Sequence, residues 1–345
     1  SVGNPKNLFG LPVIEFCTMN TDDCSIILGL NQHNSKEVRE YLIKHDFPSD
    51  RIYGVADVMQ IQDSRIGYDE LPCIDVTTHI GCSVRCKYCP QELFLKRYFQ
   101  DDADRVRNLT VETFKKCLDH LPPEAGIQFG GFSEPFLNSD CMKLINMACA
   151  SGRKVNLYTT LVGMKREDID ELLELPIEYV TLHVADKENY ANIPKSNEYY
   201  EMLQKIINSR RKDGRPLVDM CNAQTKPDNR VAEICNGRYE ISYTLIDRAG
   251  NLSGEGLVSR QIQTAGIYCG VCGNALNKNE LLPDGTLLLC CMDYGMKHVL
   301  GNLVLNDYRE IIDGNEMNRI RDGMKRNSKE SILCRKCSCA NIVKY

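Results

Sequence analysis

The chain has 345 residues, 43% of them hydrophobic, which is enough for two or three domains with a sizeable core. Its net charge of −5 predicts no basic surface, so we expect no nucleic-acid partner. No apolar run approaches the ~18 residues of a membrane span and no signal-peptide pattern is present, so we expect no membrane contact.

Eighteen cysteines stand out in this composition. In a small secreted protein they would indicate disulfides. This chain is large, and many of its cysteines cluster at metal-ligand spacings, which is typical of iron–sulfur ligation in a reducing compartment. We therefore expect a cytoplasmic protein. The cysteines outside the clusters are expected mostly as small apolar core residues.

The first region, residues 1–70, has the pattern of a strand–helix–strand module. Residues 24–30 form a buried apolar run, Ser35 can cap a helix that ends near His45, and residues 48–55 turn into a short strand. Such a unit is half of a nucleotide-binding α/β domain, but no G-x-G-x-x-G accompanies it. It resembles small α/β modules attached to bacterial glycan-modifying proteins. A purely structural lead-in is the alternative.

The second region, residues 71–250, alternates strand-like and helix-like patterns. The expected strands are residues 73–78, 126–129, 155–159, 179–184, 217–221 and 241–246. The expected helices are residues 111–121 (capped by Thr110), 140–151, 165–175 and 197–213. Six β/α repeats predict an α/β fold of parallel strands with right-handed crossovers, too few for a closed eight-stranded barrel.

A run of three cysteines follows the first of these strands. Cys82, Cys86 and Cys89 are spaced C-x3-C-x2-C, and Tyr88 precedes the last one. Three thiolates on one loop can hold three irons of a [4Fe–4S] cube and leave the fourth iron open for a ligand. A zinc knuckle is the alternative, with His79 as the only local fourth ligand.

Polar residues also follow the next strands. Gly130-Gly131-Phe-Ser-Glu134-Pro ends the second strand; its glycines allow close backbone approach, and Glu134 can accept hydrogen bonds from an ammonium group. Thr160, beside Thr159, ends the third strand. These residues predict a ligand site, with an ordinary turn as the alternative.

Two further residues are candidates for roles in catalysis. His183 ends the fourth strand and could contact substrate, accept a proton from an alcohol or bind a carboxylate. Arg248 follows the sixth strand beside a Gly-rich turn and could hold a carboxylate or a phosphate. A packed histidine and a solvated turn are the alternatives.

The third region, residues 251–345, begins Gly-rich and carries a second set of cysteines. Residues 281–283 and 286–289 flank Asp284-Gly285, which predicts a hairpin, and residues 307–325 have a helical pattern. The cysteines of this region are Cys269, Cys272, Cys290, Cys291, Cys334, Cys337 and Cys339.

Together these motifs resemble those of the radical S-adenosylmethionine (SAM) enzymes. The Gly130–Pro135 motif resembles that family's GGEP motif with two residues inserted. The resemblance implies a partial (β/α)6 barrel over residues 71–250, which the six repeats match. It implies that the open iron binds SAM, that Tyr88 lies near the adenine, that Glu134 takes the SAM ammonium, and that Thr160 touches SAM. The implied cluster ligands are Cys82, Cys86 and Cys89.

Residues 251–345 resemble the SPASM and twitch extensions of that family. From Cys272 the spacing to Gly285 and on to Cys290 matches the opening of those extensions. The resemblance implies one auxiliary [4Fe–4S] cluster, for which Cys269 or Cys339 could substitute as a ligand and zinc is the alternative. The implied ligands are Cys272, Cys290, Cys334 and Cys337.

The hypothesis that follows is a radical SAM oxidoreductase. It abstracts hydrogen from a carbinol carbon of a sugar, nucleotide sugar or cyclitol, and the auxiliary cluster accepts an electron. Dehydration and epimerisation are close variants. A flavodoxin- or ferredoxin-type protein is the expected reductant. The alternatives are a SPASM-type peptide maturase, which the strand–helix–strand pattern at the N-terminus disfavours, and a non-catalytic electron carrier.

Overall fold

The structure, a computed structural model, describes residues 71–242, 244–254 and 256–343, with short N-terminal segments at 7–8, 11–12, 26–28, 41–44 and 52–54. The chain falls into two compact units, Ser1–Tyr68 and Asp69–Tyr345. In the first unit, β1 (Asn7–Leu8) pairs antiparallel with β2 (Leu11–Pro12). There, β3 (Ile26–Leu28) pairs parallel with β4 (Ile52–Gly54), and residues 41–44 are helical. The rest of the predicted strand–helix–strand lies outside the described residues.

A nine-stranded sheet organises the second unit, with strand order β10-β9-β8-β7-β6-β5-β12-β13-β14. The strands β5 to β10 are all parallel, which confirms the predicted half barrel of six strands. Their bounds are β5 (Cys73–Val76), β6 (Gly126–Phe129), β7 (Val155–Thr159), β8 (Tyr179–His183), β9 (Met220–Ala223) and β10 (Glu240–Ile241).

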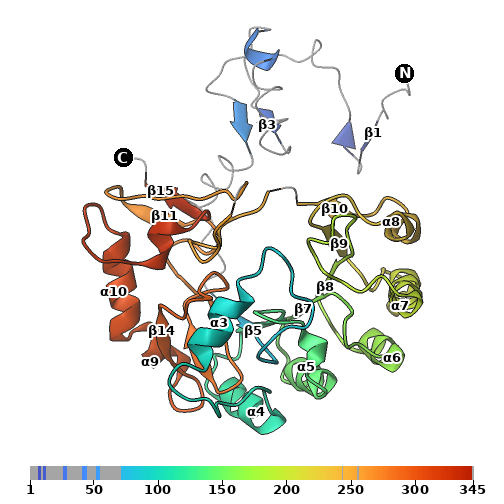
Figure 1. Cartoon of the computed structure of the whole chain (residues 1–345), viewed down its shortest axis with the longest axis horizontal. Coiled ribbons are helices and arrows are strands. Elements are labelled where there is room, and N and C mark those ends of the chain that lie inside the picture. The colour runs from blue at the N-terminus through green and yellow to red at the C-terminus, as the bar shows by residue number, and fades with distance from the viewer. Residues whose placement is uncertain are drawn as a thin grey trace. The chain divides into compact units, whose positions relative to one another are not determined.

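Helices follow most of these strands. Along the outer side of the sheet lie α4 (Val111–Asp119), α5 (Cys141–Ala150), α6 (Arg166–Glu174), α7 (Asn197–Asn208) and α8 (Asn229–Cys235) (Figure 1). The helix α3 (Gln91–Tyr98) lies apart from this row, and its Phe94 packs against Phe132 and Tyr294. The Thr110 hydroxyl caps α4 by accepting from Thr113 N at 3.0 Å, as its sequence predicts. Alternation along β5 sends the buried Ile74 and Val76 to the helix side of the sheet, so Asp75 faces the other side.

The C-terminal part extends the same sheet. Its strand β12 (Lys278–Leu281) pairs parallel with β5 and antiparallel with β13 (Thr286–Leu288) through the predicted hairpin, and β14 (Val299–Asn302) follows. A separate pair joins β11 (Ile267–Cys269) to β15 (Ala340–Ile342). The helices are α9 (Tyr308–Ile312), α10 (Asn315–Met324) and the 3-10 helix η4 (Leu333–Lys336).

Several element bounds differ from those expected. The helix expected over residues 307–325 is two helices, because the chain turns at Asp313-Gly314. The helix expected over 197–213 ends at Asn208, and the strand expected over 217–221 begins only at Met220. None of the helices in the described part of the chain has the length and apolar character needed to cross a membrane.

Candidate active site

A cavity of about 350 Å³ lies at the carboxyl ends of the parallel strands. Carboxyl ends of parallel strands meet at one edge of the sheet, so the loops that follow β5, β6 and β7 converge there. All ten barrel residues expected at the site line this cavity: Cys82, Cys86, Tyr88, Cys89, Gly130, Gly131, Glu134, Thr160, His183 and Arg248.

The loop that carries the three cysteines is anchored to the loop after β8. Lys87 N donates to Tyr190 O at 2.9 Å, and Lys87 Nζ donates to Glu188 O at 3.0 Å. The thiol of Cys89 lies 3.6 Å from Tyr294 Oη. These contacts hold the cysteine loop over the cavity rather than leaving it in solvent.

Glu134 is the most heavily hydrogen-bonded side chain of the cavity. The hydroxyl of Thr159 donates to its Oε1 at 2.6 Å, and the backbone N–H and hydroxyl of Thr160 both donate to its Oε2 at 2.6 Å. Burial raises the pKa of Glu134, and these donors oppose the increase by favouring the carboxylate. Thr160 therefore orients Glu134. The sequence had predicted a different role for Thr160, direct contact with the ligand.

The two glycines of the motif face protein groups as well as the cavity. Gly131 has φ +60°, and a Cβ there would lie 2.8 Å from Thr77 N and even closer to the side chains of Thr77 and Glu280. Gly131 N donates to Asp75 Oδ1 at 2.8 Å. The tight packing against Thr77 and Glu280 requires glycine at position 131, a reason that the motif alone does not reveal.

Two carboxyl groups, the half-buried Asp75 and the fully buried Glu280, lie side by side in the barrel interior, since they are register partners on β5 and β12. Burial raises the pKa of Asp75 to about 6. Burial, and then the charge of Asp75, raise the pKa of Glu280 well above its ordinary value. Glu280 accepts a hydrogen bond from the Thr77 hydroxyl.

His183 and Arg248 reach the cavity from different parts of the barrel. Burial, followed by the charge of Arg248, lowers the pKa of His183 to about 4, so its imidazole is neutral at pH 7. Arg248 has φ +50°, and its carbonyl accepts from Asn251 Nδ2 at 2.9 Å. The same Asn251 amide donates to Met292 O at 2.7 Å, which ties the arginine turn to the segment after Cys291.

A second cavity, small and apolar, is lined by five cysteines. It contains the four expected auxiliary ligands and also Cys269, among leucine and alanine side chains. Neither Cys339 nor Cys291 lines this small cavity. Cys291 lines the larger cavity. The cysteines around the small cavity are Cys269, Cys272, Cys290, Cys334 and Cys337.

A fully ligated [4Fe–4S] cube takes four thiolates, and these five thiols around an apolar space fit that requirement with one to spare. Among the described residues, no three His, Cys, Asp or Glu side chains are arranged to hold a single metal ion. That finding concerns one ion, whereas each cysteine ligand of a cube binds a different iron.

Two family models match parts of the chain that contribute residues to the two cavities. The radical SAM superfamily model matches residues 76–224, which include the three-cysteine loop and the ends of β5 to β8. The SPASM model, described as an iron-sulfur cluster-binding domain, matches residues 272–338. The chain therefore contains a radical SAM domain followed by a SPASM domain. As a radical SAM protein with a SPASM domain it binds SAM, a [4Fe–4S] cluster and auxiliary iron–sulfur.

Solved structures of other radical SAM proteins have a similar fold. BtrN in complex with AdoMet and 2-DOIA matches with a TM-score of 0.53 and 16% identity, over 78% of this chain and 93% of that one. SuiB of Streptococcus suis bound to the precursor peptide SuiA matches with 0.49 and 12%, over 77% and 70%. The protein anSMEcpe with bound AdoMet matches with 0.44 and 14%, over 72% and 79%. The likeness to BtrN shows the fold of this radical SAM protein.

The residues of the larger cavity that sequence reasoning missed include Asp75, Cys291 and Tyr294. Asp75 carried a signal, because an acid within an otherwise apolar strand has to face a polar interior. Cys291 appeared superfluous beside Cys290. Tyr294 had no local signal, since only the packing of the C-terminal part against the barrel brings it to Cys89.

Proposed function

We propose that this radical SAM protein oxidises a carbinol carbon of a sugar, nucleotide sugar or cyclitol to a carbonyl. One observation carries the proposal: of two adjacent residues, Cys290 lines the auxiliary cavity and Cys291 lines the larger cavity. Such an oxidation removes one hydrogen atom, one proton and one electron. An electron acceptor held by Cys290 would stand one residue from the substrate, which favours oxidation over dehydration or epimerisation.

The chain's own residues divide the remaining tasks at the larger cavity. When bound, SAM and its cluster supply the 5′-deoxyadenosyl radical that takes the hydrogen atom. Glu134, oriented by Thr160, would accept hydrogen bonds from the SAM ammonium, and Tyr88 would lie beside the adenine. The cluster ligands would be Cys82, Cys86 and Cys89, and the auxiliary ligands would be Cys272, Cys290, Cys334 and Cys337.

His183 and Arg248 act on the substrate in this proposal. The low pKa of His183, about 4, leaves its imidazole with a free lone pair at pH 7, so it can accept the carbinol proton. Arg248 carries a permanent positive charge at the same cavity and holds a phosphate or carboxylate group.

Two further parts of the proposal concern partners. The reductant is a flavodoxin- or ferredoxin-type protein. A small-molecule substrate is favoured over a peptide because β3 and β4 of the N-terminal unit pair in parallel, as in the strand–helix–strand module expected there. A peptide-binding winged helix would not have that arrangement.

The test is anaerobic incubation of the reconstituted protein with SAM, a reductant and candidate nucleotide sugars and aminocyclitols deuterated at their carbinol positions. We expect deuterium in 5′-deoxyadenosine and a product two electrons more oxidised than the substrate. A Cys86→Ala protein is the control and should release no 5′-deoxyadenosine. A product isoelectronic with the substrate would refute oxidation, and turnover only of a peptide would refute the substrate class.

A further inference from the structure

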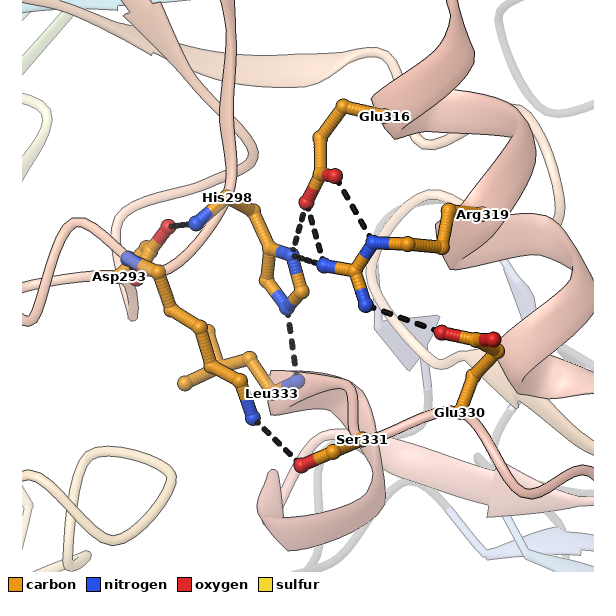
Figure 2. Close-up of polar contacts among 8 residues, drawn as sticks. Asp293, His298, Glu316, Arg319, Glu330, Ser331 and Leu333 are labelled. Carbon is orange, nitrogen blue, oxygen red and sulfur yellow. Dashed lines mark hydrogen bonds and ion pairs between the residues drawn. The ribbon is translucent and has the colours of Figure 1, made fainter.

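A buried histidine lies between the two segments that carry the auxiliary cysteines. The side chain of His298 is fully buried and precedes β14. Leu333 N donates to its Nε2 at 2.9 Å, and Glu316 Oε1 lies 2.7 Å from its Nδ1 (Figure 2). Both ring nitrogens are therefore engaged, one by η4 and the other by α10.

These contacts determine the tautomer of His298. Because Nε2 accepts the Leu333 N–H, it has a free lone pair, so the ring proton is on Nδ1 and is donated to Glu316. Arg319 approaches Nδ1 to 3.2 Å, but it forms two bonds to the Glu316 carboxylate, at 2.7 and 2.9 Å. The arginine therefore holds Glu316 in position for the histidine.

The surroundings keep the ring neutral. Burial lowers the pKa of His298, and Arg319 and Lys297 act in the same direction, while Glu316 opposes them. On the backbone side, the Asp293 carboxylate accepts from His298 N at 2.8 Å and from Lys297 N at 2.8 Å. A charged ring would carry a proton on Nε2, facing the Leu333 N–H, so the contact to η4 requires the neutral form.

His298 accepts two backbone hydrogen bonds, each from a residue that directly precedes a cysteine of the auxiliary cavity. Its Nε2 holds Leu333, which directly precedes Cys334, and its carbonyl accepts from Leu289 N at 3.1 Å, directly before Cys290. Leu289 and Leu333 both line the auxiliary cavity. One residue thus fixes the backbone on two sides of the cavity that are more than forty residues apart in the sequence.

We propose that His298 is a positioning residue for the auxiliary cluster, holding the Cys290 and Cys334 segments at the separation that the cluster needs. Partners that orient metal ligands in this way are typical of metal sites. The inference rests on these two cysteines being auxiliary ligands, as the proposed function assumes, and not on the reaction or the substrate.

Two substitutions at His298 separate its two contacts. The terminal amide of His298→Gln reaches the position of Nε2 and can accept the Leu333 N–H. The shorter side chain of His298→Asn reaches only the position of Nδ1, so it keeps Glu316 within reach and leaves the buried Leu333 N–H without an acceptor.

A matched control exists in the barrel. Tyr199 Oη accepts the buried Ala185 N–H at 3.1 Å, so Tyr199→Phe removes the acceptor of one buried backbone N–H far along the chain from the auxiliary cysteines. A general loss of stability would act on this variant and on His298→Asn alike.

The measurements are iron per chain and the electron paramagnetic resonance spectrum of the reduced, anaerobically reconstituted protein, with and without SAM. We expect about eight irons in wild type, His298→Gln and Tyr199→Phe. For His298→Asn we expect about four irons, or an altered signal from the cluster that does not respond to SAM, with the SAM-responsive signal retained.

Several results would overturn the inference. His298→Asn could keep the full iron content and an unchanged auxiliary signal, or His298→Gln could lose the cluster to the same extent. Loss of iron in Tyr199→Phe would make the effect one of general stability. A wild-type protein with only about four irons would remove the auxiliary cluster itself. None of these results depends on turnover, so a failed search for substrate would leave the inference standing.

Discussion

Substitution of Gly131 by alanine tests the packing behind the cavity. Gly131 and Gly152 both adopt left-handed backbone, with φ of +60° and +75°. A Cβ on Gly152 would meet nothing within 4 Å, whereas a Cβ on Gly131 would lie 2.8 Å from the backbone nitrogen of Thr77. The two alanine variants therefore share the conformational cost and differ in crowding.

The expected losses of unfolding free energy follow from this conformational cost and from crowding. An alanine in left-handed backbone costs about 1–2 kcal/mol, which is the full effect expected for Gly152→Ala. Crowding of a well-packed interior adds about 1–3 kcal/mol, so Gly131→Ala should lose about 2–5 kcal/mol of the free energy of unfolding. The neighbour at Thr77 is backbone paired to Leu281 O at 2.9 Å, so it cannot easily move away.

Urea unfolding of the cofactor-free protein measures the difference, because a shift of the midpoint at constant m-value reports a change in stability. The reasoning is refuted if the two variants lose the same free energy, or if Gly152→Ala loses more. Gly131→Ala should also weaken SAM binding, since Gly131 lines the larger cavity, while Gly152→Ala should leave SAM affinity unchanged.

Three further predictions concern the barrel interior and the two cavities. Burial raises the pKa of Glu280, so its contribution to stability is complete below pH 4.5 and is lost as the pH rises. Glu280→Gln should therefore be more stable than wild type at pH 8. In urea unfolding series this margin should shrink on acidification, by up to about 1.4 kcal/mol per pH unit. Cys290→Ser should reduce the iron content from about eight to about four per chain, whereas Cys291→Ser should keep about eight; equal loss in both would contradict the division between cavities. His183→Asn should still transfer deuterium to 5′-deoxyadenosine but form the carbonyl product at least ~100-fold more slowly, as measured in single-turnover assays, and an unchanged product rate would exclude His183 as the proton acceptor.

Most of the barrel could be predicted from its sequence because strong local signals coincide with its elements. The apolar runs of β6, β7 and β8 and the Thr110 cap of α4 each mark their own boundaries. The end of α7 had no comparable signal. It ends where Arg211 turns back to donate to Leu217 O at 3.0 Å, a contact that only the folded chain reveals. The seven-residue α8 is too short for its periodicity to be distinguished from chance.

The same distinction between local signals and long-range contacts applies to the candidate site. Residues at the carboxyl ends of parallel strands have to meet at one edge, so the sequence order of β5 to β8 already brings Cys82, Glu134 and His183 together. Contacts made by β12 obey no such local rule, since its place beside β5 is decided by packing between segments some 200 residues apart in sequence. That pairing sets Glu280 against Asp75 and brings the hairpin that leads to Cys290 and Cys291 up to the barrel. The position of the auxiliary cavity relative to the larger cavity therefore depends on one long-range strand pairing. This explains why the spacing of the cysteines could predict a second cluster but not the cavity that each thiol lines.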